Sequence, residues 1–305
     1  MTIDVLARVG LVLGEGPLWH AERGSVLWVD ILAGHVWECA LGGEPRIVVE
    51  HHEPVGCLAL ARTGELVGMT GSGLWRLDPE PALLVANPEA SPDLRANDGK
   101  ADPAGRFVGG TMGFPEPTPA GGTLWSFADG TARPLLRGLT ISNGLAWWTD
   151  PTTAATTMYH VDTPTGEVRA YEYELASGSM GGARTLAAVH PRDGLPDGVA
   201  LDVDGGLWVA LHGGGKLHRY DPDGALTAVV ELPVAHVTCP AFVGPGLTQL
   251  VVTTATEAFQ GDPGTAPPGA GDVYLVDPGV AGAATHEVDL AVVIGEGQAL
   301  ADPPR

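Results

Sequence analysis

The sequence is poor in cysteine. Its 305 residues include only Cys39, Cys57 and Cys239, and no Cys-x-x-Cys pair occurs. An odd and widely spaced set of this kind indicates neither a disulfide framework nor a zinc knuckle. We therefore expect three buried thiols.

Basic residues and long apolar runs are also scarce. The chain has 16 Lys and Arg against 37 Asp and Glu, which gives a formal net charge of −21. A surface of this sign repels nucleic-acid phosphates and anionic lipids. No apolar run approaches the roughly 18 to 20 residues of a transmembrane helix, and residues 1–16 lack the basic start of a signal peptide. These absences predict a soluble, cytoplasmic protein with neither a nucleic-acid nor a membrane partner.

Glycine and proline, in contrast, are abundant. The 44 Gly and 26 Pro residues are dispersed among short runs rich in Val, Leu and Trp, and hydrophobic residues make up 44% of the chain. Turn-forming residues at this frequency favour many short strands over long helices. The composition therefore indicates a folded, all-β protein.

One short phrase recurs along the whole chain: a polar residue, a glycine, then an apolar run. Its anchor positions, spaced 40 to 54 residues apart, are Gly16, Gly56, Gly99, Gly144, Gly198 and a degenerate sixth at Pro240. Propeller blades repeat every 40 to 50 residues or so. We therefore predict a six-bladed β-propeller with about four antiparallel strands per blade, forming a single domain of residues 1–305. The strand-like run Ile3–Val9 should complete the last blade and close the ring.

The position before each anchor carries chemistry. In chain order it holds Glu15, Val55, Asp98, Asn143, Asp197 and Cys239. Asn-Gly and Asp-Gly are ordinary turn dipeptides, which explains each one singly. Turn formation does not explain why these dipeptides precede the same strand in repeat after repeat. Carboxylates gathered at one axis repel each other unless a cation neutralises them. The pattern therefore favours a metal site on the propeller axis.

Four motifs together closely resemble the regucalcin/gluconolactonase (senescence marker protein) family. They are Glu15–Trp19, Arg95–Arg106, Ile141–Leu145, and Pro196–Gly198 with the following Gly206–Ala210. They occur in the family's order and at its spacing. The resemblance implies a six-bladed propeller with one divalent metal ion on its axis, and in many members the hydrolysis of sugar lactones.

The resemblance also implies roles for individual residues. Glu15, Asn143 and Asp197 match the family's metal ligands, and Arg95 and Asn97 match residues that contact substrate hydroxyls. Three oxygen ligands suit Ca²⁺, Mg²⁺ or Mn²⁺, and Zn²⁺ also accepts them. Such an ion polarises the lactone carbonyl and activates water. Asp197 would then be the catalytic general base.

One departure from the family affects specificity. The glutamate that contacts substrate in members such as regucalcin falls on Pro115, with Glu116 next to it. The leading prediction is a metal-dependent lactonase whose partner is a small sugar-derived lactone. Two alternatives stay open: hydrolysis of another cyclic ester or an organophosphate ester at the same metal, and a calcium-binding propeller without catalysis.

Overall fold

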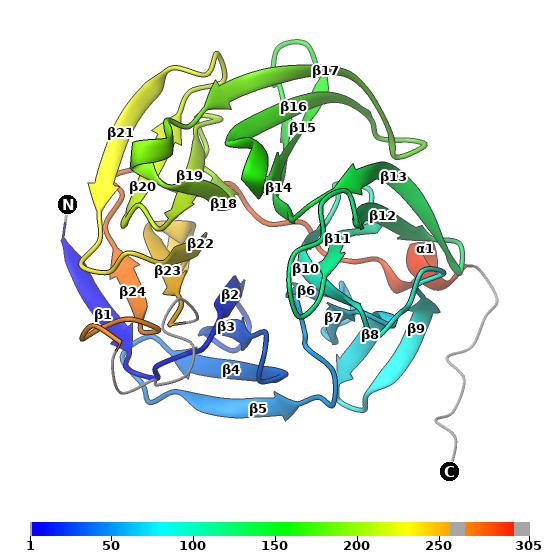
Figure 1. Cartoon of the computed structure of the whole chain (residues 1–305), viewed down its shortest axis with the longest axis horizontal. Coiled ribbons are helices and arrows are strands. Elements are labelled where there is room, and N and C mark those ends of the chain that lie inside the picture. Colours follow the sequence, from blue (N-terminus) through cyan, green and yellow to red (C-terminus); the bar gives the residue numbers. More distant parts are fainter. Residues whose placement is uncertain (1, 257–265, 296–305) are drawn as a thin grey trace.

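Six antiparallel sheets form a ring in the computed structural model, which describes residues 2–256 and 266–295 (Figure 1). Each sheet has four strands, so the chain is a six-bladed β-propeller, as the repeat predicted. Blades 1 to 3 contain β2 (Gly14–His20), β3 (Ser25–Asp30), β4 (His35–Ala40) and β5 (Arg46–Glu50); β6 (Cys57–Leu60), β7 (Leu66–Thr70), β8 (Gly73–Asp78) and β9 (Ala82–Ala86); and β10 (Leu94–Ala101), β11 (Phe107–Gly113), β12 (Gly122–Ala128) and β13 (Thr131–Leu139).

The other half of the ring is built in the same way. Blades 4 to 6 contain β14 (Ser142–Thr149), β15 (Thr156–Asp162), β16 (Glu167–Glu174) and β17 (Ser179–Ala188); β18 (Leu195–Leu201), β19 (Leu207–His212), β20 (Lys216–Tyr220) and β21 (Leu226–Glu231); and β22 (Val237–Val243), β23 (Gln249–Thr254), β24 (Val273–Val276) and β1 (Ile3–Ala7). The helical segments are η1 (Thr163–Thr165), η2 (Pro191–Asp193), η3 (Pro245–Leu247) and α1 (Leu290–Ile294).

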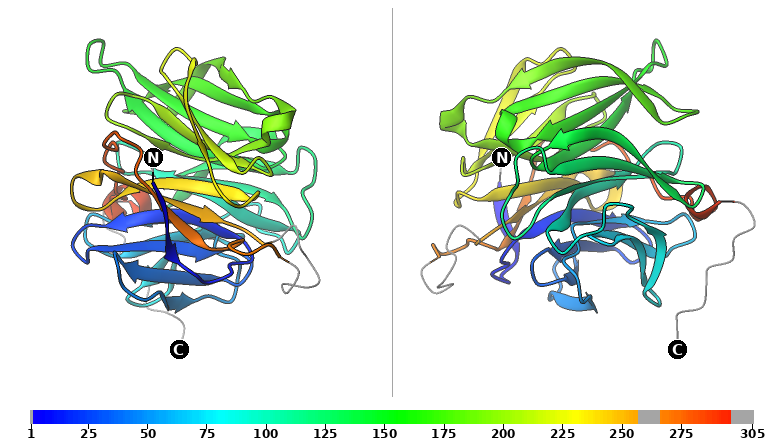
Figure 2. Two further views of the ribbon diagram at one scale, coloured as in Figure 1. Left: turned by 90° about the vertical axis from the view of Figure 1, so that its left-hand side faces the viewer. Right: turned by 45° about the vertical axis from the view of Figure 1, so that its right-hand side comes forward.

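The N-terminal strand closes the ring. Strand β1 pairs with β24 from Ile3 opposite Val276 to Ala7 opposite Val273, and the two strands lie side by side in Figures 1 and 2. The prediction that residues 3–9 complete the last blade is confirmed, although the strand ends at Ala7. The last blade thus combines a strand from the start of the chain with three from its later part, and β1 covers the edge that β24 would otherwise expose.

Burial falls from the axis outwards. Every residue of β11 is buried, whereas the outermost strand of the same blade, β13, has a mixture of exposed and partly buried positions. Inner strands are covered on both faces by neighbouring blades, which is why they read as continuous apolar runs. Trp28, Trp125 and Trp208 are at most 1% exposed and fill these contacts between blades. The inner strands are therefore a rigid support for side chains at the axis.

A segment after the last blade crosses the ring. Residues 281–289, here called the axial strap, run from blade 5 towards blades 2 and 3 (Figure 1). Gly282 forms a β-bridge with Asp202 at one end, and Val288 forms one with Ala61 at the other. Helix α1 follows and contacts β9 and β12. The strap therefore ties opposite sides of the propeller together.

Two further predictions concern the cysteines and membranes. All three cysteines are free and buried, as expected. Within residues 2–256 and 266–295, no helix has the length and apolarity needed to span a bilayer.

A buried histidine makes folding sensitive to acid. His160 on β15 is 1% exposed, its Nε2 lies 3.0 Å from Ser142 Oγ, and burial lowers its pKa from 6.5 to about 3. Because the folded state disfavours the charged ring, its contribution is present above pH 6.5 and is lost as pH falls towards 3. We expect the melting temperature to fall across this range, and His160→Gln to flatten the fall. Thermal unfolding at several pH values measures it; His52→Gln, at an exposed histidine, should keep the wild-type slope. Equal slopes in all three proteins would contradict the assignment.

Candidate functional site

Irregular pairing marks the inner strands where the candidate residues lie. The register of β2 shifts between Glu15 and Leu18, and that of β14 shifts between Asn143 and Leu145. Bulges of this kind re-aim side chains and are common beside active sites. Gly144 shows why the motif needs glycine: its φ is +28°, and a Cβ there would lie 2.6 Å from the carbonyl oxygen of Asp197. The Ser-Asn-Gly phrase thus lets blade 4 approach blade 5 closely.

The register corrects the predicted alignment of the residues that precede the anchor glycines. In β10 the unpaired positions between Ala96 and Gly99 are Asn97 and Asp98, whereas in β18 they are Asp197 and Gly198. Asn97, not Asp98, is therefore the equivalent of Asp197. The assumption that the residues before the anchor glycines occupy one level was wrong. Glu15 and Asn143 are the last paired residues before their bulges, whereas Asp197 is the first unpaired residue of its bulge and Asp98 the second.

Two of the three predicted ligands touch each other. Asn143 Nδ2 donates a hydrogen bond to Asp197 Oδ1 across blades 4 and 5, and a second one, at 3.1 Å, to Thr163 Oγ1. Asn143 Oδ1 accepts the N–H of Gly144 at 3.2 Å. Coordination through this oxygen would require the amide to turn its Oδ1 towards Asp197. The contact brings together residues that are 54 positions apart in the chain.

Glu15 is the third predicted ligand and is held in a low-dielectric site. Its Oε2 accepts the N–H of Gly16 at 2.8 Å. Burial and then the nearby Asp98 carboxylate raise the pKa of Glu15 to about 8, against the opposing effects of Gly16, Lys100 and Arg95. Burial likewise raises the pKa of Asp98. The protein therefore concentrates carboxylates where water stabilises them poorly.

These residues fit a hard divalent cation. Asp98 Oδ2 is buried without a hydrogen-bond partner, and Glu15, Asn143 and Asp197 are each at most 6% exposed. Oxygen donors of this kind suit Ca²⁺, Mg²⁺ or Mn²⁺. In residues 2–256 and 266–295, no group of three or more His, Cys, Asp or Glu side chains is placed to hold a metal. A site here therefore depends on the amide of Asn143.

Arg95 and Asn97 form one hydrogen-bonded unit. Arg95 Nη1 donates to Asn97 Oδ1 at 2.7 Å and to the carbonyl of Ala96 at 2.9 Å. Asn97 Nδ2 donates to the carbonyl of Ser142 at 2.9 Å, which joins blade 3 to blade 4. The sequence predicted substrate contacts for both. The structure adds a positioning role for Asn97, since its amide also holds the residue before Asn143.

The family model described as the SMP-30/Gluconolactonase/LRE-like region matches residues 13–256. The chain belongs to this family. Regucalcin of Xenopus laevis is 34% identical over 276 residues, covering 87% of this chain and 90% of that protein. The 6-deoxy-6-sulfogluconolactonase of Pseudomonas putida is 33% identical over 261 residues, covering 84% and 88%.

A solved structure shares the whole architecture of this family member. The calcium-binding protein regucalcin of Agrobacterium tumefaciens superposes with a TM-score of 0.84 at 29% identity, covering 94% of this chain and 96% of that one. The sequence-based assignment to the regucalcin/gluconolactonase family is confirmed.

The loop that departs from the family pattern lies at the Arg95 end of the channel. Leu94 and Arg95 pair with Gly113 and Met112, directly before this β11–β12 loop. Glu116 in the loop is exposed. Glu116 therefore lies at the surface, in the loop that follows the β11 residues paired with Leu94 and Arg95.

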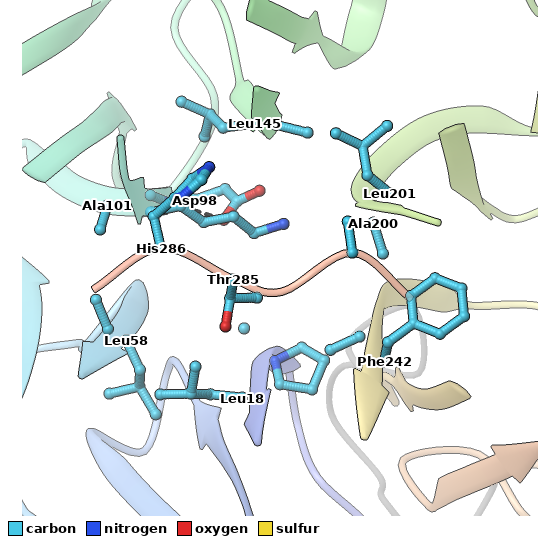
Figure 3. A pocket seen from close by; sticks show the side chains of 18 of the residues that line it. Leu18, Leu58, Asp98, Ala101, Leu145, Ala200, Leu201, Phe242, Thr285 and His286 are labelled. Atoms are coloured by element: carbon cyan, nitrogen blue, oxygen red, sulfur yellow. Dashed lines mark hydrogen bonds between the residues drawn. The ribbon is translucent and has the colours of Figure 1, made fainter. Parts of the chain in front are cut away.

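The opposite half of the channel contains a cavity of about 80 Å³ (Figure 3). Its polar side chains are Asp98, Lys100, Thr285 and His286, and apolar residues such as Leu18, Leu58 and Phe242 form most of the remaining wall. The axial strap crosses it, and none of the three predicted ligands lines it. The three predicted ligands thus lie outside this cavity, whereas Asp98 belongs both to the cavity wall and to the carboxylate cluster around Glu15.

Sequence reasoning missed three contributors to this arrangement. Thr163 bonds Asn143 from a 3₁₀ turn, and Thr285 and His286 come from the strap. None belongs to the repeated phrase, so the repeat gave no signal for them. Lys100 belongs to the Arg95–Arg106 motif but received no role there.

Proposed function

We propose that this chain is a divalent-metal-dependent lactonase that hydrolyses a sugar-derived lactone. The observation that carries the proposal is the inter-blade contact of Asn143 with Asp197, within the same buried carboxylate cluster as Glu15. Family membership supports it, since one relative is named as a sulfogluconolactonase. The expected compartment is the cytoplasm, because the free, buried cysteines fit a reducing environment.

The proposed ligands are Glu15, Asn143 and Asp197. A bound divalent ion would polarise the lactone carbonyl and lower the pKa of water. Asp197 takes a proton from the attacking water while the oxygen of that water bonds to the carbonyl carbon of the lactone. The ring C–O bond then breaks, and the leaving alkoxide takes this proton from Asp197, which gives a hydroxy acid and returns Asp197 to its carboxylate form. Without metal, the hydrogen bond from Asn143 Nδ2 to Oδ1 holds the Asp197 carboxylate in place; as a ligand, Asn143 would turn its Oδ1 to the ion instead.

Arg95 and Asn97 supply orientation. The Arg95 guanidinium is planar and carries several donors in a fixed fork, so it can bond substrate oxygens while keeping its bond to Asn97. The hydrogen bond to the Ser142 carbonyl fixes the position of the Asn97 amide. Together they are suited to the hydroxyl and ring oxygens of a sugar lactone.

A panel of sugar lactones tests the proposal. Chelated protein is reconstituted with Ca²⁺, Mg²⁺, Mn²⁺ or Zn²⁺, and acid release is followed by pH-stat titration. We expect at least one lactone to be hydrolysed faster than its spontaneous rate, with activity lost on chelation. Metal binding without acceleration on any lactone, cyclic ester or organophosphate would favour the second candidate, a calcium-binding propeller. That candidate is supported by the description of the Agrobacterium relative as calcium-binding.

The Arg95–Asn97 unit yields a further prediction. Arg95→Ala and Asn97→Ala should each lower kcat/KM by an amount equivalent to about 1.5 to 3 kcal/mol of transition-state stabilisation. This is the scale of a lost charge-assisted hydrogen bond. Because the two side chains bond each other, the double variant should lose less than the sum. Steady-state kinetics measures this, and Arg133→Ala, at an exposed arginine of β13, is the control. Activity losses that merely follow the folded fraction would argue for a structural role alone.

A further inference from the structure

Lys100 makes a hydrogen bond between two blades that are not neighbours. Its Nζ, on β10 of blade 3, donates to the carbonyl oxygen of Val199 on β18 of blade 5 at 2.5 Å. Blade 4 lies between these blades in the ring (Figure 1). The lysine side chain therefore passes through the interior of the channel instead of along the wall of its own blade.

The acceptor of this bond lies close to the proposed base. Val199 is two residues after Asp197 and is the first paired residue after the bulge, opposite Val209. The bulge itself has no ladder bond to β19 at Asp197, so the backbone there depends on contacts from other blades. Asn143 from blade 4 bonds the Asp197 side chain, and Lys100 from blade 3 bonds the backbone carbonyl of Val199.

The Lys100 ammonium also lies among the axial carboxylates. Lys100 and Asp98 line the same cavity, and the ammonium opposes the rise in the pKa of Glu15, Asp98 and the buried Cys239 thiol. Asp98 has one oxygen bonded to the N–H of Gly99 at 2.7 Å and the other without a hydrogen-bond partner. Lys100 thus opposes the negative charge that the cluster of carboxylates creates.

We propose that Lys100 is a positioning residue with two separable effects: its charge holds the axial carboxylates together without metal, and its hydrogen bond to Val199 fixes the strand that carries Asp197. The second effect rests on the proposed lactonase function, whereas the first concerns metal binding alone. No substrate contact is assigned to Lys100, because it lines the cavity that the axial strap crosses.

The charge effect predicts tighter metal binding in Lys100→Met. A lysine near the ligands repels the incoming cation, so its removal should lower the Kd for Mn²⁺ by roughly fivefold. Asp98→Asn should raise that Kd by a similar factor, and the double variant should return close to wild type. Titration calorimetry with Mn²⁺ on chelated protein measures all four proteins. A Kd unchanged or raised in Lys100→Met would overturn the charge effect.

The hydrogen-bond effect predicts a different pattern in kinetics. At saturating metal, Lys100→Met should lower kcat by about tenfold with little change in KM, because Asp197 is less well placed while substrate contacts stay intact. The double variant should keep this defect, since it also lacks the bond to Val199. A restored kcat in the double variant, or a wild-type kcat in Lys100→Met, would refute the proposed role of the hydrogen bond to Val199.

Lys216→Met is the matched control. Lys216 begins β20 of blade 5 and pairs with Asp193 at 3.0 Å, away from the axis. It should leave both the Mn²⁺ affinity and kcat unchanged, and a change equal to that of Lys100→Met would show that any lost lysine suffices. If no lactone is hydrolysed by the wild-type protein, the lactonase proposal fails, but the Mn²⁺ titrations still decide the charge effect.

Discussion

Asp197→Asn is expected to lower lactonase activity by roughly 10²-fold or more while the protein retains its metal and its fold. The asparagine keeps an oxygen that can bind the metal, and in the metal-free protein this oxygen can accept the hydrogen bond from Asn143 Nδ2. It cannot take a proton from water, so the loss should appear in kcat. Kinetics at saturating metal, together with elemental analysis of the purified variant, measures the two properties separately.

Asp193→Asn is the control for this substitution. Asp193 lies four residues earlier, in the turn η2, where it pairs with Lys216 and does not face the axial cluster. Its amide variant should have near wild-type activity. If Asp197→Asn also kept wild-type activity with metal bound, another group would be the base, and Asp98 would be the next candidate because of its unpartnered Oδ2.

The sequence predicted the fold well because the fold is repetitive. Five glycine-anchored phrases and a degenerate sixth at Pro240 predicted six equivalent inner strands, and the run at residues 3–9 was assigned to the last blade. The axial strap could not be predicted in this way. Residues 281–289 contain no repeated phrase, and their course is fixed by bridges to Asp202 and Ala61, which lie far away in the chain.

The candidate site was predictable only to within one residue. A repeat identifies a position in each blade, but the register within a bulge depends on both strands, which is why Asn97 and not Asp98 aligns with Asp197. Contacts across the ring could not be predicted either, because they depend on strands from different blades. The bond from Lys100 to Val199 joins residues 99 positions apart, and no local pattern encodes it.

Glu15→Gln should abolish stabilisation by metal without destabilising the metal-free protein. In the absence of metal, burial and then the nearby Asp98 carboxylate raise the pKa of Glu15 to about 8, so folding at neutral pH must protonate this carboxyl or bury its charge. A neutral amide of the same size removes that cost and can keep the contact with Gly16 N–H. The melting temperature of the metal-free variant should therefore equal or exceed that of the metal-free wild type.

Added metal should distinguish the two proteins. At a metal concentration 100 times its Kd, the wild type gains about 2.7 kcal/mol by mass action, and the variant, lacking a charged ligand, should gain little at the same concentration. Thermal unfolding with and without Ca²⁺ or Mn²⁺ measures this difference. Glu38→Gln is the control, since Glu38 is buried in the same blade but bonds Ser25 and Arg46. It should lower both melting temperatures and leave the shift between them intact, because its carboxylate stabilises the blade itself. An undiminished metal shift in Glu15→Gln would instead remove Glu15 from the ligand set and leave Asp98 to take its place beside Asn143 and Asp197.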